Sequence, residues 1–179
     1  MPAYILTGAP GAGKTAVLRL LDINGHVVVE EAATDAIARD NALGREEPWH
    51  DHAFIDKVIT LQRQRQNSVR AAKTATVFFD RSPVCTLVLS RYLGFTTSYL
   101  LAREVDRVVA GGVYETTVFF IRHQGFIQTT AARRISFEDS LVFEQLDEQI
   151  YRELGFQLVE VPAGLDQSAV AAISGPGLP

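Results

Sequence analysis

Short apolar runs alternate along the chain with longer segments of helical periodicity. The runs predict buried strands over residues 3–7, 26–30, 76–80, 116–121 and 157–161. Between them, the spacing of apolar residues predicts helices over residues 14–21, 32–41, 53–73, 83–93, 101–109, 137–154 and 166–174. Strands that are separated by helices and apolar along their whole length are typical of a parallel sheet buried on both faces. We therefore expect an α/β fold, a P-loop NTPase sandwich with one five-stranded parallel sheet between two layers of helices.

Local signals mark the starts of two of these helices. Ser82 followed by Pro83 predicts a capped helix start, and Ser136 with Asp139 resembles a capping box. In the helix after Ser136, apolar residues at i, i+4 spacing are expected to face the core. They are Val142, Leu146, Ile150 and Leu154.

The composition is that of one ordinary globular domain. The chain has 179 residues, of which 47% are hydrophobic and 21% charged, and these values exclude an intrinsically disordered protein. We expect a single domain over residues 1–174 and a flexible tail over residues 175–179. The net charge of −4 argues against a general nucleic-acid binder, because such a protein needs a strongly basic surface.

The cysteine content and the lengths of the apolar runs indicate the cellular compartment of the protein. Cys85 is the only cysteine, so neither an intramolecular disulfide nor a cysteine-based zinc cluster can form. The first residues lack a signal-peptide pattern, and the apolar runs are too short for a transmembrane segment. We therefore expect a cytoplasmic protein. Its oligomeric state stays open, with a homodimer as one option.

Residues 8–15 match the phosphate-binding pattern G-x-x-x-x-G-K-[ST] at every position. They are Gly8, Ala9, Pro10, Gly11, Ala12, Gly13, Lys14 and Thr15. The segment follows a predicted strand and precedes a predicted helix, which is the context of a P-loop. Backbone N–H groups would hold the phosphates, Lys14 would reach the β- and γ-phosphates, and the Thr15 hydroxyl would bind Mg²⁺. The motif predicts a protein that binds ATP with Mg²⁺ as cofactor.

Acidic residues end two other predicted strands. Ligands bind at the carboxyl ends of the strands in parallel sheets, so these acids should lie near the P-loop. Asp80 could hold Mg²⁺, or it could cap the helix that follows it. Glu31, or Glu30 beside it, could accept a proton from a hydroxyl group or orient a water molecule. The alternative for these glutamates is ordinary capping of the next helix.

Arginines flank a segment that has no clear periodicity. Arg122 precedes it, and Arg133 and Arg134 lie near its end. Arginine neutralises the charge that develops during phosphoryl transfer, so residues 123–136 could form a lid over bound nucleotide. The alternative is a solvated basic surface.

The loop over residues 43–52 could cover a pocket for the phosphoryl acceptor, with Trp49 stacked on a flat substrate. Gln62 or Arg63, on the following helix, could face the same acceptor. A metal site in this loop is not expected, because two histidines and one acid are too few ligands. Cys85 lies in an apolar helix, where packing is the expected role.

Three segments resemble the P-loop small-molecule kinases, a group that includes nucleoside, deoxynucleoside and nucleotide kinases. They are GAPGAGKT at residues 8–15, VVVEEAATDAIARD at residues 27–40 and VFFDRSP at residues 77–83. Nearly the whole chain is similar to compact AAA-type ATPases related to the ribosylnicotinamide kinase domain. The likeness to deoxynucleoside kinases implies that Glu31 or Glu30 is the base and that Asp80 binds Mg²⁺. It also implies a phosphoryl or substrate contact for Arg81 and lid arginines at Arg133 and Arg134.

These expectations describe an enzyme that binds ATP and Mg²⁺ and transfers the γ-phosphate to a small hydroxyl-bearing acceptor. That acceptor would be nucleoside-like or another metabolite. The alternative is a nucleotide-dependent regulatory switch, or an ATPase or GTPase with slow hydrolysis, that acts through a partner. The sequence neither names the acceptor nor decides between ATP and GTP.

Overall fold

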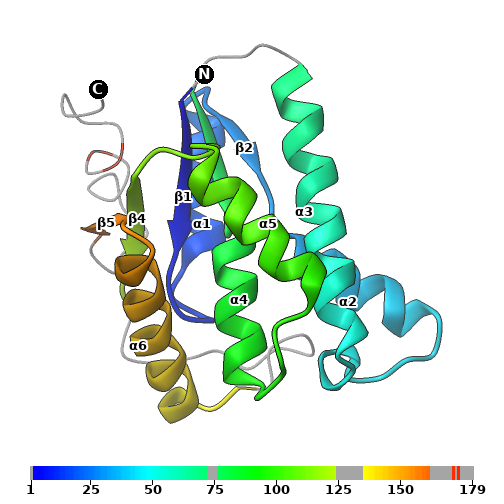
Figure 1. Cartoon of the computed structure of the whole chain (residues 1–179). Coiled ribbons are helices and arrows are strands. Elements are labelled where there is room, and N and C mark those ends of the chain that lie inside the picture. The colour runs from blue at the N-terminus through cyan, green and yellow to red at the C-terminus, as the bar shows by residue number, and fades with distance from the viewer. Residues whose placement is uncertain (1, 72–75, 124–134, 162–170, 172, 174–179) are drawn as a thin grey trace.

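Five parallel strands form a twisted sheet at the centre of the molecule (Figure 1). This computed structural model describes residues 2–71, 76–123, 135–161, 171 and 173. The strands are β1 (Ala3–Thr7), β2 (Val27–Val29), β3 (Val77–Asp80), β4 (Thr117–Ile121) and β5 (Gln157–Val161), and their order in the sheet is β2-β3-β1-β4-β5. The predicted five-stranded parallel sheet is confirmed, and each strand ends within one residue of its expected limits.

The helices also follow the predicted order. They are α1 (Lys14–Ile23), α2 (Ala32–Ala42), the 3₁₀ turn η1 (Pro48–His50), α3 (Ala53–Ala71), α4 (Pro83–Tyr92), α5 (Tyr99–Ala110) and α6 (Phe137–Glu153). None of these described helices is long and apolar enough to cross a membrane. Most of the expected lid segment, nearly all of the expected helix over residues 166–174 and the expected tail lie outside the described residues.

Helices lie on both faces of the sheet, and alternate residues of β1 point to opposite faces. Tyr4 and Leu6 belong to a cluster with residues of α1, whereas Ala3 and Ile5 belong to a larger cluster with residues of α2 to α6. In Figure 1, α1 lies behind the sheet and α3, α4, α5 and α6 lie in front of it. The strands β1, β3 and β4 are therefore covered on both sides, which explains why they are apolar along most of their length, whereas the edge strand β5 is largely exposed.

The carboxyl ends of β1, β2 and β3 meet at one edge of the sheet. The register pairs Leu6 of β1 with Asp80 of β3, and Val29 of β2 with Phe79 of β3. The P-loop leaves β1 immediately after Thr7. The sheet therefore brings together the phosphate-binding motif and the acids that follow β2 and β3, as the sequence predicts for this type of sheet.

The buried face of α6 matches the prediction in part: Ile150 is buried, and Leu146 and Leu154 pack against the core. Val142, the first residue of the expected stripe, is 55% exposed. The buried residues of α6 are Ser140, Phe143, Glu144, Asp147, Ile150 and Tyr151. Each i, i+4 step overshoots a full turn by about 40°, so a stripe of four such residues cannot stay on one face. The buried face also contains carboxylates, which a search for apolar periodicity does not find.

Candidate functional site

The P-loop turns tightly from β1 into α1. Gly8 has a φ angle of +132°, and a Cβ atom at this position would lie 2.2 Å from the carbonyl oxygen of Ile121. Only glycine is accommodated there without movement of the backbone. The Lys14 ammonium closes the loop, because it donates hydrogen bonds to the carbonyl oxygens of Gly8 (2.9 Å) and Ala9 (2.7 Å). Thr15 follows on the first turn of α1 and is exposed.

Lys14 lies in an environment that disfavours its charge. Burial, and then the nearby Arg81 guanidinium, lower the pKa of Lys14 to about 8, while Asp80 and Glu31 act in the opposite direction. A bound anion would add negative charge beside this ammonium and stabilise it. The loop is therefore suited to a phosphate ligand.

Residues 80–82 form the turn between β3 and α4. Arg81 has a φ angle of +71°, which residues with a side chain rarely adopt, and its N–H donates to the Leu6 carbonyl oxygen at 3.0 Å. The hydroxyl of Ser82 accepts a hydrogen bond from the Val84 N–H at 3.2 Å and so caps α4. Because Ser82 occupies the cap, helix capping does not account for the buried carboxylate of Asp80.

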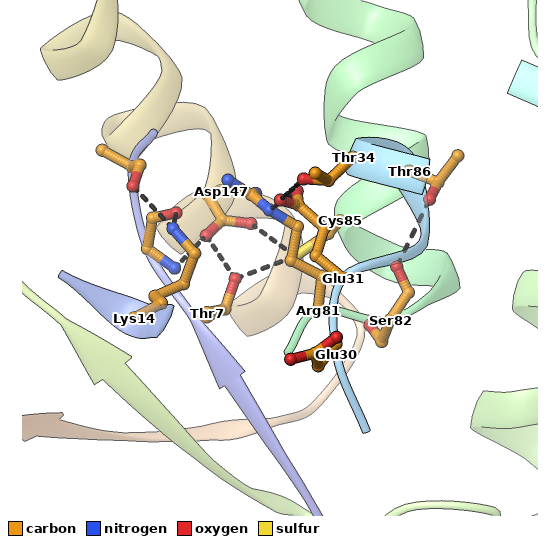
Figure 2. Close-up of polar contacts among 12 residues, drawn as sticks. Thr7, Lys14, Glu30, Glu31, Thr34, Arg81, Ser82, Cys85, Thr86 and Asp147 are labelled. Carbon is orange, nitrogen blue, oxygen red and sulfur yellow. Dashed lines mark hydrogen bonds and ion pairs between the residues drawn. The ribbon is translucent and has the colours of Figure 1, made fainter. Parts of the chain in front are cut away.

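Arg81 reaches across from the end of β3 to the end of β2. Its Nε atom lies 2.6 Å from a carboxylate oxygen of Glu31, and the Thr34 hydroxyl donates to the other oxygen at 3.0 Å (Figure 2). Burial alone would raise the pKa of Glu31, but Arg81 and then Lys14 hold it below its usual value. Glu31 occupies the cap position of α2 without making a side-chain hydrogen bond to the helix backbone. One oxygen of its carboxylate therefore faces Arg81 in the site, while the other is bound by the Thr34 side chain of α2.

A pocket opens between the ends of β2 and β3 and the helix α3. It is a shallow depression open to solvent, and its interior of about 10 Å³ has room for roughly one water molecule. Its lining residues are Val29, Glu30, Ala32, Gln62, Arg65, Phe79, Asp80, Arg81 and Tyr114. Glu30 is exposed, whereas Phe79 and Tyr114 are buried, with their rings edge to face at 5.2 Å. The pocket thus combines an aromatic wall with acidic and basic groups beside the P-loop.

The helix α3 contributes two polar side chains to this pocket. Arg65 donates to the Glu30 carbonyl oxygen at 2.7 Å and also pairs with Asp35 of α2. The carboxamide oxygen of Gln62 accepts a hydrogen bond from the Thr86 hydroxyl at 3.1 Å. Gln62 therefore lies where the sequence predicts. Arg63, the other candidate, pairs with the buried Glu104 at 3.5 Å.

A buried polar network behind the P-loop was not predicted from the sequence. Asp147 of α6 is completely buried, and one of its oxygens accepts hydrogen bonds from the Thr7 hydroxyl (2.7 Å) and the Gly8 N–H (3.1 Å). The Cys85 thiol donates to its other oxygen at 3.7 Å. Burial raises the pKa of Asp147, and burial together with Asp147 raises that of Cys85 to about 11. Cys85 is thus a buried, protonated thiol, consistent with packing. Asp147 is one of several acids of α6 and lies off the predicted apolar stripe, so the sequence carries no signal for this network.

The remaining candidates lie elsewhere or are occupied by other contacts. Arg122 pairs with Glu144, Glu148 and Glu160 and lies over the Phe120 ring. Trp49 packs against the large core cluster and is not among the residues that line the pocket. Within the described residues, no group of three or more histidine, cysteine or acidic side chains could hold a metal ion. Arg133 and Arg134 lie outside the described residues.

Solved structures of nucleotide and nucleoside kinases have the same fold. One is thymidylate kinase from Ehrlichia chaffeensis, with 15% sequence identity, a TM-score of 0.65 and 97% coverage of both chains. Another is deoxyadenosine kinase from M. mycoides with dCMP and dCDP as products, with 14% identity, a TM-score of 0.57 and 96% coverage of both chains. The same enzyme with bound dATP matches with a TM-score of 0.53 at 14% identity and 97% coverage. At this identity the likeness establishes the fold.

The family described as an AAA domain matches residues 3–167. No curated protein matches the sequence significantly. The match covers nearly all of the chain, from β1 through the P-loop and beyond the last strand. The chain therefore belongs to this AAA-domain family, and its fold is that of the P-loop kinases.

Proposed function

We propose that the protein transfers the γ-phosphate of ATP to a hydroxyl group of a small molecule that binds at the ends of β2 and β3. The observation that supports this most is the pocket beside the P-loop, whose wall includes Glu30, Asp80 and Arg81. Phosphoryl transfer requires an acceptor that is positioned and shielded from water next to the phosphates. A nucleotide switch or a simple hydrolase has no need of a second pocket with an aromatic wall.

The phosphate side of the reaction would use the P-loop. Backbone N–H groups of residues 8–15 and Lys14 would hold the phosphates. The Thr15 hydroxyl and the Asp80 carboxylate are hard oxygen donors and suit Mg²⁺, which takes few protein ligands when phosphates and water supply the rest. When bound, Mg²⁺ would neutralise charge on the phosphates. Arg81 would add a second cation at the same place.

Two glutamates are candidates for the base, and they have different environments. The pairing with Arg81 keeps Glu31 ionised but also makes it a weak proton acceptor. An acceptor hydroxyl that enters the site would have to displace or share this ion pair. Glu30 is exposed and lines the pocket, so it could accept a proton without that rearrangement. We place Glu31 first, because its carboxylate pairs with Arg81 and lies near enough to Lys14 of the P-loop to influence the pKa of that residue.

The charges of the pocket favour an acceptor without a phosphate group. Among the described lining residues, both arginines are already paired, Arg65 with Asp35 and Arg81 with Glu31. A phosphate monoester would meet Glu30 and Asp80 with no unpaired guanidinium from this wall to balance it. We therefore expect a neutral acceptor, which would bind at the opening of this depression, because Phe79 and Tyr114 are buried behind it.

Arg133 and Arg134 remain part of the proposal as residues that act in the transition state. An arginine that contacts the phosphates mainly in the transition state changes turnover more than binding. We expect alanine at either position to reduce kcat substantially and to change the Kd of ATP little. Steady-state kinetics and calorimetry on both single variants measure this difference.

A substrate screen with γ-labelled ATP tests the proposal. Neutral nucleosides and other small alcohols are supplied one at a time, and label is counted in organic product and in free phosphate. The proposal expects transfer to at least one acceptor, and none with the Lys14→Ala variant. Label that appears only in free phosphate for every acceptor would indicate the alternative, a regulatory switch or a slow hydrolase.

A further inference from the structure

Gly8, the first residue of the P-loop, is held from two sides. The N–H of Gly8 donates to the buried Asp147 carboxylate at 3.1 Å, and the carbonyl oxygen of Gly8 accepts from Lys14 at 2.9 Å. At Gly8 the chain leaves β1, so this N–H is beyond the strand pairings that end at Thr7. Figure 2 shows Asp147 between Thr7 on one side and Cys85 on the other. The carboxylate thus reaches the loop from a helix more than a hundred residues away in the sequence.

Nucleotide binding should affect the contact of Gly8 with Lys14 but not its contact with Asp147. Lys14 donates to two carbonyl oxygens in the empty loop and has one N–H left, so it would shift toward a bound phosphate and weaken these contacts. Asp147 is completely buried and does not compete for the ligand. Once Lys14 has moved, the bond from Gly8 to Asp147 is what keeps the start of the loop in place.

The same helix makes a comparable contact at a neighbouring strand. Glu144, one turn before Asp147, accepts the His123 N–H at 3.2 Å just beyond the end of β4. Both side chains are buried acids that hold a backbone N–H at the carboxyl end of a strand. Of these two acids, only Asp147 binds a residue of the P-loop. A comparison of variants at Asp147 and Glu144 can therefore distinguish a general role of α6, which is to hold strand ends, from a specific role in nucleotide binding.

We propose that Asp147 is a positioning residue that orients the P-loop through the Gly8 N–H and so sets the affinity for nucleotide. Three donors converge on its carboxylate, from Thr7, Gly8 and Cys85, which suits an acceptor-only group. An asparagine offers one neutral oxygen in place of two charged ones, so the Gly8 N–H would lose either its acceptor or the charge of that acceptor. The start of the loop would then be held less firmly, although the side chain would keep its shape.

The test compares Asp147→Asn with Glu144→Gln, each measured for MgADP affinity by calorimetry and for thermal unfolding. We expect the Kd of Asp147→Asn to rise by roughly tenfold, as for the loss of a charged hydrogen bond, and that of Glu144→Gln to stay within about twofold. Loss of a buried negative charge alone would strengthen phosphate binding and lower Kd. A Kd that falls or stays unchanged in folded Asp147→Asn would therefore overturn the proposal.

A second measurement uses the unaltered protein and so does not depend on the folding of a variant. Amide hydrogen exchange by NMR reports the Gly8 N–H directly. We expect this amide to be protected in the empty protein and to stay protected with MgADP, while those of Gly11 and Gly13 gain protection only with the nucleotide. Rapid exchange of the Gly8 amide in the empty protein would contradict the proposal.

Discussion

The two halves of the candidate site are held together by different kinds of contact. On the phosphate side, one continuous segment of eight residues is fixed by hydrogen bonds to its own backbone, from Lys14 and from the buried Asp147. On the acceptor side, the groups come from β2, β3 and α3, and ion pairs between side chains hold them, such as that of Arg81 with Glu31. Backbone contacts are indifferent to most side-chain changes, whereas ion pairs depend on each partner.

This difference indicates how the two halves can change. The geometry of the phosphate side follows from glycine positions and backbone N–H groups, so it suits any nucleotide with the same phosphates. The acceptor side can be retuned by single substitutions at Glu30, Gln62 or Arg65 without disturbing the P-loop. Mutations on the phosphate side should therefore affect every reaction of the protein, and those on the acceptor side should affect one substrate.

The largest effect is expected for Lys14→Ala on the phosphate side. Loss of the charged contacts to the phosphates should weaken MgATP binding by roughly 10²-fold or more and abolish turnover. The fold should persist, because the burial that lowers the pKa of Lys14 means that its charge is already disfavoured in the empty protein. Calorimetry and thermal unfolding measure both quantities, with Lys57→Ala as a control at a lysine that pairs with Asp40. Unaltered ATP affinity would contradict this account of the loop.

On the acceptor side, Glu31→Gln should lower turnover by roughly 10²–10⁴-fold while it leaves the Kd of ATP nearly unchanged. The matched variant is Glu30→Gln, one residue earlier and exposed. If Glu30→Gln shows the large loss and Glu31→Gln does not, the roles of the two glutamates are exchanged. Turnover that is unaffected by either substitution would leave both residues without a catalytic role.

Above the pKa of Lys14, the Kd of MgATP should rise by about tenfold per pH unit. This dependence concerns the phosphate side alone. Above pH 8 the empty protein loses the Lys14 proton, so MgATP affinity should fall as pH rises and binding should take up a proton. Calorimetry at pH 8 to 9 in buffers of different ionisation heat detects this uptake. The free energy of unfolding of the empty protein should rise over the same range, because the unfolded chain keeps the proton to higher pH. Binding without proton uptake would contradict the lowered pKa of Lys14.

The smallest effect is expected for Arg65→Ala. Its partner Asp35 is 60% exposed, so the loss of this ion pair should cost less than about 1 kcal/mol of stability. The KM for the acceptor should nevertheless rise several-fold, because Arg65 lines the pocket, while the Kd of ATP should not change. Arg39→Ala, at an exposed basic residue of α2, is the control. A rise in the Kd of ATP would show that the two halves are not independent.

The contrast between the halves also explains what could be predicted from the sequence. Each strand and the P-loop is one continuous segment of the sequence. The apolar runs therefore predict the strands, and the glycine spacing predicts the P-loop, without a structure. Asp80 and Glu31 could be placed because acids at strand ends are unusual in an otherwise apolar run. The pairing of Arg81 with Glu31 depends on the order of β2 and β3 in the sheet, and only the resemblance to known kinases pointed to Arg81.

The roles of Asp147 and of the residues that line the pocket could not be predicted from the sequence, for a different reason. A buried carboxylate looks the same in a sequence as an exposed one, and α6 contains several acids of which most are at least partly exposed. Tyr114 lies in the turn between α5 and β4, with no periodicity to indicate that it would line a pocket. Such contacts depend on which elements pack together, and this information is not local.

The central claim is that the glutamates at the end of β2 serve the hydroxyl group of an acceptor rather than a water molecule. The most direct measurement is the partition of label from γ-labelled ATP between organic product and free phosphate, with a saturating acceptor, for the unaltered protein and for Glu31→Gln. The account predicts that most label enters the organic product and that Glu31→Gln suppresses this transfer far more than it changes phosphate release. Label found only in free phosphate, at a rate that no acceptor alters, would contradict it.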